Sequence, residues 1–341
     1  MSSPEIVFSP SRMRGMRPKT KTWIKHLAIL VLTFFTCTLA GAIRPFGYIS
    51  PFEFINAPPD ADFTTVMAAL PLAYVLLIKN VTIALFTNAI IAQHAVTFSV
   101  SFLLILTAHE MGHYIACRIY GVNATLPFFI PTPPMIGPAG TLGAFIRIIS
   151  PFPSRQALFD IGVAGPIAGF VVVVPIAVLS FLTYKYAPNI PMQQGDFDIT
   201  FSDPLFNHIL APVFGIDLSV PAYPNPFYSA AWLGFLVTAL NLIPSGQLDG
   251  GHAVFAVFGE RAHKLFGTIA FIAMASFSVL GMYFYGSPSG FLFALILLIM
   301  LRVGHPRPLD ETPLNNGRLI IAFITLLIFV LSFTPIPVKL N

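Results

Sequence analysis

The sequence is poor in charged residues. Only 9% of its 341 residues are Asp, Glu, Lys or Arg, whereas soluble globular proteins carry about 25%. Hydrophobic residues make up 56%, and the mean hydropathy is +0.80. This balance excludes an ordinary soluble domain and indicates a polytopic membrane protein. The net charge of +4 is small, and Lys and Arg cluster at the ends of apolar runs, so we expect no nucleic-acid partner.

Cysteines and long polar loops are scarce as well. Cys37 and Cys117 lie in different apolar segments, which excludes a disulfide framework and a CxxC metal pair. The longest loop, 185–227, has about 40 residues, whereas most independent domains exceed roughly 50. We therefore expect no soluble accessory domain.

Long apolar runs are what the sequence has instead, and a membrane-spanning helix needs roughly 17–25 such residues. The run 64–93 is ambiguous, because Pro71 and Lys79-Asn80 interrupt it. It could be a short hairpin, a re-entrant piece or a helix on the outer face. We predict an all-α polytopic membrane protein with about seven spans, in a range of six to nine. The predicted spans are 24–43, 96–118, 156–184, 228–246, 265–285, 290–303 and 317–335.

The charge pattern predicts the orientation. The basic N-terminus precedes the apolar run 27–43, which could be a signal peptide ending at Ala40-Gly41-Ala42; we favour an uncleaved first span. Positive residues predict a cytoplasmic N-terminus. We take a bacterial plasma membrane as the default, with a plastid or archaeal membrane as alternatives. The loop 185–227 is expected outside because it carries Asp196, Asp198, Asp203 and Asp217.

The segment 127–147 has five prolines and three glycines, a density that forbids an ordinary helix. Irregular backbone at membrane depth is tolerated only where protein or a water-filled cavity covers it. We predict a re-entrant loop or β-hairpin that presents a strand edge to an unwound substrate. The predicted substrate-binding residues there are Gly140, Thr141, Leu142 and Gly143. The alternative is a plug that covers the site.

Three ionisable residues lie within the apolar run 96–118, where such side chains are costly. His109 and His113 are four residues apart, so on a helix they share a face and can bind one zinc ion. Glu110 can then reach the metal's water as a general base. With eight histidines in the chain, about 0.003 matches to HExxH are expected by chance. The alternative is a buried polar cluster that only packs.

A catalytic zinc ion usually has three protein ligands, so a third is needed. Cys117 is one candidate because it lies four residues after His113, although we favour its alternative, a small buried apolar side chain. Asp249 is the other, in the sequence NLIPSGQLDGGH, where Pro and Gly would break a helix and let the carboxylate bend toward its neighbours. Asp249 could instead cap the following helix. The residues alone leave the choice open.

Together the two motifs resemble those of the site-2 protease family, which are intramembrane zinc metalloproteases. His109-Glu110-xx-His113 and Asn241-xx-Pro244-xxx-Leu248-Asp249-Gly250 match at every defining position, and the resemblance covers roughly residues 95–305. Gln247 stands where many members carry proline.

The resemblance implies a site-2 protease-like helical core with one Zn²⁺ per chain. It implies that His109, His113 and Asp249 hold the zinc and that Glu110 activates water. It also implies that Asn241 is a catalytic or substrate-binding residue that positions the substrate or steadies the oxyanion. The charge pattern agrees with this, because it brings both motifs to a similar depth in the cytoplasmic half.

The predicted function is a zinc-dependent intramembrane endopeptidase that cleaves membrane-spanning proteins or peptides within the lipid bilayer, near its cytoplasmic side. The expected regions are an N-terminal part, 1–94, a catalytic core, 95–255, and C-terminal spans, 256–341. The rival functions are a polytopic transporter or metal carrier, or an inactive relative that only binds membrane proteins.

Two further sets of residues give weaker signals. Gly162, Gly165 and Gly169 recur at spacings that let helices approach closely, which predicts a span packed between the two motif helices. His252, His263 and His305 lie near the cytoplasmic ends of spans, and we expect them to be surface or interface residues.

Overall fold

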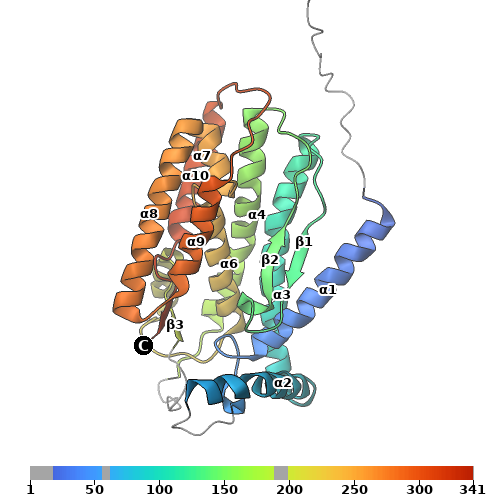
Figure 1. Cartoon of the computed structure of the whole chain (residues 1–341), viewed down its shortest axis with the longest axis vertical. Helices are drawn as coiled ribbons and strands as arrows, with labels where there is room; N and C mark the ends of the chain where they lie inside the picture. The colour runs from blue at the N-terminus through green and yellow to red at the C-terminus, as the bar shows by residue number, and fades with distance from the viewer. Residues whose placement is uncertain (1–17, 56–61, 188–198, 341) are drawn as a thin grey trace, which may run out of the picture.

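The computed structural model describes residues 18–55, 62–187 and 199–340, and most of them are helical (Figure 1). Every predicted span coincides with a helix, which confirms the helical class of the protein. Most of these helices run along the long axis of the molecule, and α1 crosses it obliquely (Figure 1). They are α1 (Thr20–Ala42), α3 (Ala89–Ile119), α4 (Arg155–Leu182), α6 (Pro226–Leu242), α8 (Glu260–Tyr285), α9 (Ser289–Arg302) and α10 (Asn316–Ser332).

Within the described ranges, five helices are long and apolar enough to cross a membrane: α1, α2 (Phe63–Thr87), α3, α4 and α8. Helices α6, α9 and α10 are apolar but shorter, with 17, 14 and 17 residues. The structure therefore supports a polytopic helical protein without fixing the number of spans.

The ambiguous run 64–93 forms α2 (Phe63–Thr87) and the first turn of α3. Pro71 lies inside α2 and does not end it; the helices meet at Asn88. The Asn88 side chain accepts hydrogen bonds from the N–H groups of Ile90 and Ile91, so it caps α3. Figure 1 shows α2 as one continuous helix across one end of the bundle, so this segment is not a hairpin.

The proline-rich segment contains the predicted hairpin. Strands β1 (Phe128–Pro131) and β2 (Thr141–Phe145) are antiparallel, and the pairing continues through the bridge between Ala124 and Ile148. Helix α1 holds the hairpin, because the Thr36 hydroxyl donates to the Gly140 carbonyl at 2.7 Å and His26 Nδ1 lies 2.8 Å from the Pro127 carbonyl.

A second small sheet lies at the opposite end of the bundle from the junction of α7 (Asp249–Phe258) and α8 (Figure 1). Strand β3 (Ile199–Phe201) pairs with β4 (Val338–Leu340), next to the short helix α5 (Leu205–Leu210). Trp232 of α6 fixes this end by donating from its indole N–H to the Ser202 carbonyl at 2.8 Å. Of the acidic residues predicted for this loop, Asp196 and Asp198 lie outside the described residues.

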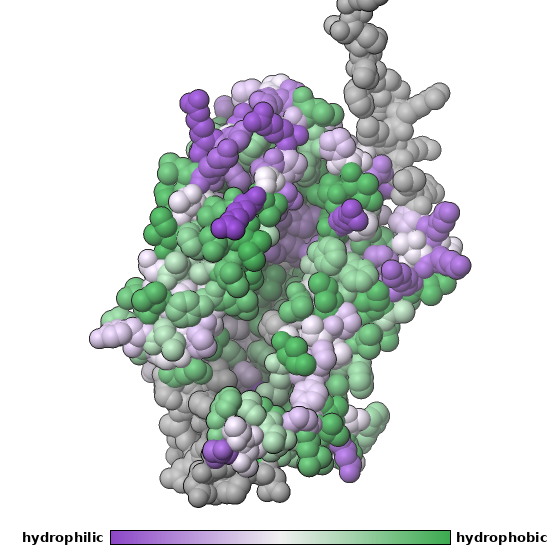
Figure 2. Space-filling view, in the orientation of Figure 1, coloured by the Kyte–Doolittle hydropathy of each residue, from purple (hydrophilic) through white to green (hydrophobic). Residues whose placement is uncertain are grey.

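The core sits where α3, α4 and α6 pack together. Phe98, Ile105, Val173 and Phe235 are each at most 2% exposed and belong to one apolar cluster. By contrast, many large apolar side chains on the outer helix surfaces are exposed, and Figure 2 shows hydrophobic residues over the sides of the molecule. A chain with a packed centre and an apolar exterior is built for a lipid surrounding.

Candidate active site

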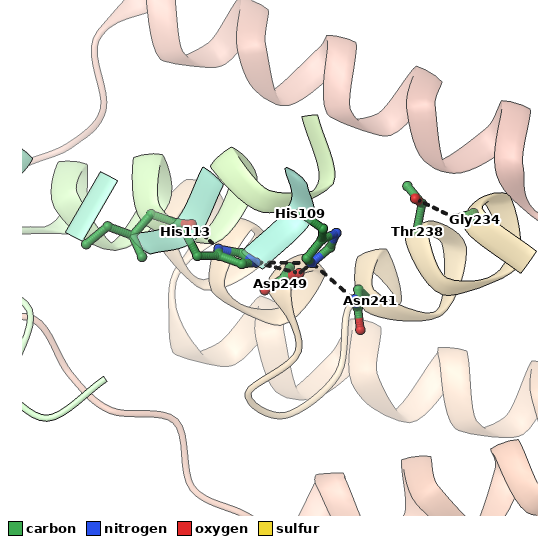
Figure 3. Close-up of polar contacts among 7 residues, drawn as sticks. His109, His113, Gly234, Thr238, Asn241 and Asp249 are labelled. Carbon is green, nitrogen blue, oxygen red and sulfur yellow. Dashed lines mark hydrogen bonds and ion pairs between the residues drawn. The ribbon is translucent and has the colours of Figure 1, made fainter. Parts of the chain in front are cut away.

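Three side chains from two distant segments converge inside the helical core (Figure 3). His109 and His113 project from α3, and Asp249 is the first residue of α7 (Asp249–Phe258). His109 Nε2, His113 Nε2 and Asp249 Oδ2 form a triangle in which each pair of atoms is 3.2 Å apart. The described residues contain no other group of three or more His, Cys, Asp or Glu side chains that could hold a metal ion.

The triangle has the dimensions of a metal site. A tetrahedral zinc ion with bonds of about 2.0–2.1 Å places neighbouring ligand atoms about 3.3 Å apart. Both imidazoles are buried, at 3% and 7% exposed, and Asp249 is only partly accessible. Cys117, the other predicted third ligand, is absent from this group and packs in an apolar cluster with Val122 and Leu158. The donor set therefore fits a metal through Asp249 rather than Cys117.

Glycines of α4 make room for the two histidines. A Cβ atom at Gly165 would lie 2.1 Å from His113 Nε2, and one at Gly169 would lie 3.3 Å from the His109 ring. The Ile161 carbonyl of α4 accepts a hydrogen bond from His113 Nδ1 at 2.7 Å, which leaves the Nε2 lone pair facing the triangle. The predicted packing of this span against both motif helices is confirmed, because α4 contacts α3 and α7.

The turn between α6 and α7 aims Asp249 at the histidines. Gly246 adopts a positive φ of 53°, and a Cβ at Gly250 would lie 2.0 Å from the Leu242 carbonyl. A side chain at residue 250 would therefore push α7 away from the end of α6. The same turn brings Asn241, in the last turn of α6, to the site, where its Nδ2 is 3.2 Å from His109 Nε2 (Figure 3).

A cavity of about 700 Å³ opens beside the triangle. Figure 2 shows a polar recess between the part of the molecule that carries α9 and the part that carries the hairpin. Glu110 lines the cavity although it is only 7% exposed, and Ile146 lines the same cavity. Asn241 and Asp249 line it as well.

The segment that follows β2 forms one wall of this cavity. Arg147 and Ile149 direct their backbone polar groups toward residues 123–125, since Thr125 N–H donates to the Arg147 carbonyl and Ile149 N–H to the Asn123 carbonyl. Backbone groups alternate along a strand, so those of residues 144, 146 and 148 lie on the free edge. Ala144, Ile146 and Ile148 line the cavity together with Glu110 and the triangle, so this free edge lies at the candidate active site.

The structure places the predicted substrate-binding residues 140–143 elsewhere on the hairpin. None of them lines the cavity, whose wall begins at Ala144. Gly140 packs against α1, since a Cβ there would lie 2.3 Å from the Thr36 carbonyl, and Leu142 is 62% exposed. The wall 144–149 was missed because composition alone does not say which part of the hairpin passes the metal ligands.

Two of the three histidines that we expected at a surface or interface, His252 and His263, are buried instead. His252 is 8% and His263 is 7% exposed, and both rings pack around His305 with centroid distances of 4.8 and 5.0 Å. His263 Nε2 lies 2.9 Å from the Gly246 carbonyl, and His252 lines the cavity. The prediction was wrong for His252 and His263 because it considered only their position at span ends, whereas the turn after α9 folds back onto α7. His305 itself is partly exposed.

The sequence model of Peptidase family M50 matches residues 97–285, more than half of the chain. The chain belongs to this family. The match confirms the resemblance to the site-2 proteases, and its range includes every residue of the triangle, Glu110, Asn241 and the hairpin.

Similar family members are known from plants. The protein named "Probable zinc metalloprotease EGY1, chloroplastic" from Oryza sativa subsp. japonica is 28% identical over 98% of this chain and 54% of its own length. The protein of the same name from Arabidopsis thaliana is 29% identical over 82% of this chain and 45% of its own. "Probable zinc metalloprotease EGY2, chloroplastic" from Oryza sativa subsp. indica is 28% identical, covering 77% and 48%.

The chain spans about half the length of the curated relatives it matches. These relatives are named as chloroplastic proteins, so they give no support to the bacterial membrane predicted from the sequence.

Proposed function

We propose that this protein is a zinc-dependent intramembrane endopeptidase. The observation that carries the proposal is the triangle of His109, His113 and Asp249, set beside Glu110 in a cavity within apolar helices. A metal carrier also needs ligands, but it has no need of a carboxylate next to them. The names of the plant relatives, which call them probable zinc metalloproteases, support the same assignment.

His109, His113 and Asp249 would hold the zinc ion. Zinc bound there supplies a Lewis acid that lowers the pKa of water and polarises the scissile carbonyl. The Ile161 carbonyl keeps His113 in the tautomer that binds through Nε2, because it accepts the Nδ1 proton.

Glu110 is the general base and acid of the proposed reaction. It adjoins the ligand His109 in sequence and faces the cavity, so its carboxylate can take the proton of the attacking water. The same carboxyl group then gives that proton to the amine that leaves when the C–N bond breaks.

Asn241 is proposed to steady the oxyanion or the substrate carbonyl. Its amide donor is 3.2 Å from His109 Nε2, within reach of an oxygen that lies beside the metal ligands. Donors held in place before the reaction stabilise charge that develops in the transition state, typically by a factor of about 10²–10³ in rate.

The free edge of residues 144–148 is our proposed substrate-binding strand, in place of residues 140–143. A peptide bond in a helix is shielded by its own hydrogen bonds, so a membrane-spanning substrate must be extended before it is cut. An extended substrate can pair with this free edge by strand addition. Because Ile146 and Glu110 line the same cavity, a paired substrate would pass the catalytic carboxylate. Cleavage near the cytoplasmic side, with the N-terminus cytoplasmic, remains part of the proposal.

The test combines zinc content with cleavage of synthetic transmembrane peptides. The wild-type protein is expected to bind one zinc ion per chain and to cleave. Glu110→Ala should keep the zinc and lose cleavage, because only the base is removed, whereas His109→Ala and Asp249→Ala should lose both. Undiminished cleavage by Glu110→Ala would refute the proposal, and a zinc-bound wild-type protein that cleaves no such peptide would favour a metal carrier.

A further inference from the structure

A pair of histidines joins the wall of the cavity to the turn that follows α9. His252 of α7 lines the cavity, and its Nδ1 is 2.8 Å from His305 Nε2. His305 lies flat on Phe255, with ring centroids 4.1 Å apart and an interplanar angle of 10°. Gln247 adds a second tie by donating to the Gly304 carbonyl at 2.8 Å. The proposed mechanism uses neither histidine.

The hydrogen bonds of this pair determine where the protons are. His305 Nδ1 is 2.8 Å from the Pro306 carbonyl, and a carbonyl only accepts, so His305 carries its proton on Nδ1. Burial, together with the neighbouring rings of His252 and His263, lowers the pKa of His305 to about 3, so the ring is neutral at pH 7. Its Nε2 is therefore an acceptor, and His252 must donate from Nδ1.

This arrangement leaves His252 Nε2 as an unprotonated acceptor. Within the described ranges, no hydrogen-bond partner contacts His252 Nε2, and the atom is not among the enclosed polar atoms that lack a partner. It therefore faces the cavity, in the part where the Phe152 ring approaches that of His252 with centroids 5.7 Å apart.

An acceptor in this cavity suits a specific group on the substrate. An extended peptide that pairs with residues 144–148 uses one row of its backbone groups for the pairing, and the alternate row stays free. The free row includes N–H donors, which lose their water when the peptide enters the cavity and so need an acceptor. A neutral imidazole nitrogen is suitable, since a carboxylate would add charge close to Asp249.

We propose that His252 binds substrate by accepting a hydrogen bond from one backbone N–H of the extended peptide, and that His305 positions it by fixing its tautomer. This inference rests on the proposed function, because it takes the extended peptide as the ligand. His252 contacts the substrate, and His305 acts only through His252.

The experiment measures peptide binding separately from cleavage. The probe is a fluorescent synthetic transmembrane peptide, titrated into zinc-loaded protein that carries Glu110→Gln and so does not consume it. Adding His252→Leu is expected to weaken binding about 3- to 10-fold, the effect of one hydrogen bond. Adding His252→Gln should restore most of the affinity, because the Gln oxygen can accept at the position of Nε2. His305→Gln keeps an acceptor for His252 and should bind normally, while His305→Leu should resemble His252→Leu.

A second series changes the peptide instead of the protein. Single backbone N–H groups are replaced by ester oxygens, and one replacement is expected to weaken binding by the same factor. That penalty should vanish with His252→Leu and with His305→Leu, the latter serving if His252→Leu does not fold. Equal penalties in all variants, or no sensitive position, would overturn the inference. Failure of the proposed function is separate, because it would appear as absent cleavage by the unmodified protein.

Discussion

Adding a single methyl group at Gly165 should weaken metal binding while the protein still folds. A Cβ atom there would lie 2.1 Å from His113 Nε2, whereas ordinary van der Waals contact begins at 3.4 Å. In Gly165→Ala, the ring or the helix must therefore move by about 1.3 Å. The ring cannot turn aside freely, because its Nδ1 is held by the Ile161 carbonyl at 2.7 Å.

Such a displacement is large for a metal ligand. Zinc sites require ligand distances within about 0.2 Å of their ordinary values. Losing a residue that only orients a ligand typically costs 10–100-fold in metal affinity. We therefore expect Gly165→Ala to weaken zinc binding at least about 100-fold, measured by competition with a chromophoric chelator in detergent micelles.

Gly169→Ala is the matched control, because it adds the same methyl group one turn further along the same helix. There the new atom would lie 3.3 Å from the His109 ring, so a shift of a few tenths of an ångström relieves the contact. We expect its zinc affinity to stay within a few-fold of wild type. Equal zinc affinities for Gly165→Ala and wild type, with helical content unchanged, would refute the account of how α4 positions His113.

The remaining predictions concern the oxyanion donor, the metal, an ion pair and pH. Asn241→Ala should keep its zinc and lose about 10²-fold in kcat, as seen in cleavage time courses, because one preorganised donor is gone. Dialysis against a chelator should abolish cleavage and added zinc should restore it, whereas activity that survives metal removal would contradict the assignment of the ligands. Arg318→Ala should lower the free energy of unfolding by about 2 kcal/mol, because it removes the three charge-assisted bonds, 2.7 to 3.1 Å long, from the partly buried Asp160. Below about pH 6 the unfolded chain binds a proton on His305, whereas the folded chain does not, because the pKa of His305 in the folded protein is about 3. The free energy of unfolding should therefore decrease as the pH is lowered from about 6 toward about 3, and it should decrease less steeply in His305→Gln.

Much of the metal site could be predicted from the sequence because its geometry is local. Residues four apart share a helix face, which brings His109 and His113 together whatever the rest of the chain does. Asp249 could not be chosen over Cys117 by spacing alone; the family motif decided it, and the structure agrees because Gly250 lets α7 start against α6.

Other features depend on packing that no local pattern encodes. A helix that crosses a bilayer and one that lies on its surface can share one apolar composition, so the transverse position of α2 was only one of three alternatives. The free strand edge at residues 144–148 depends on which residues of the hairpin face 123–125. The contact between His252 and His305 joins residues 53 apart and requires the turn after α9 to fold back.

The most direct test of the central claim is the fate of water oxygen during cleavage. A transmembrane peptide is incubated with the zinc-loaded protein in H₂¹⁸O, and the products are identified by mass spectrometry. The account predicts a cut within the membrane-spanning part of the peptide, one ¹⁸O atom in the new carboxyl group, and neither product with Glu110→Ala at equal zinc content. An unlabelled carboxyl group, or labelled product formed equally fast by Glu110→Ala, would contradict it.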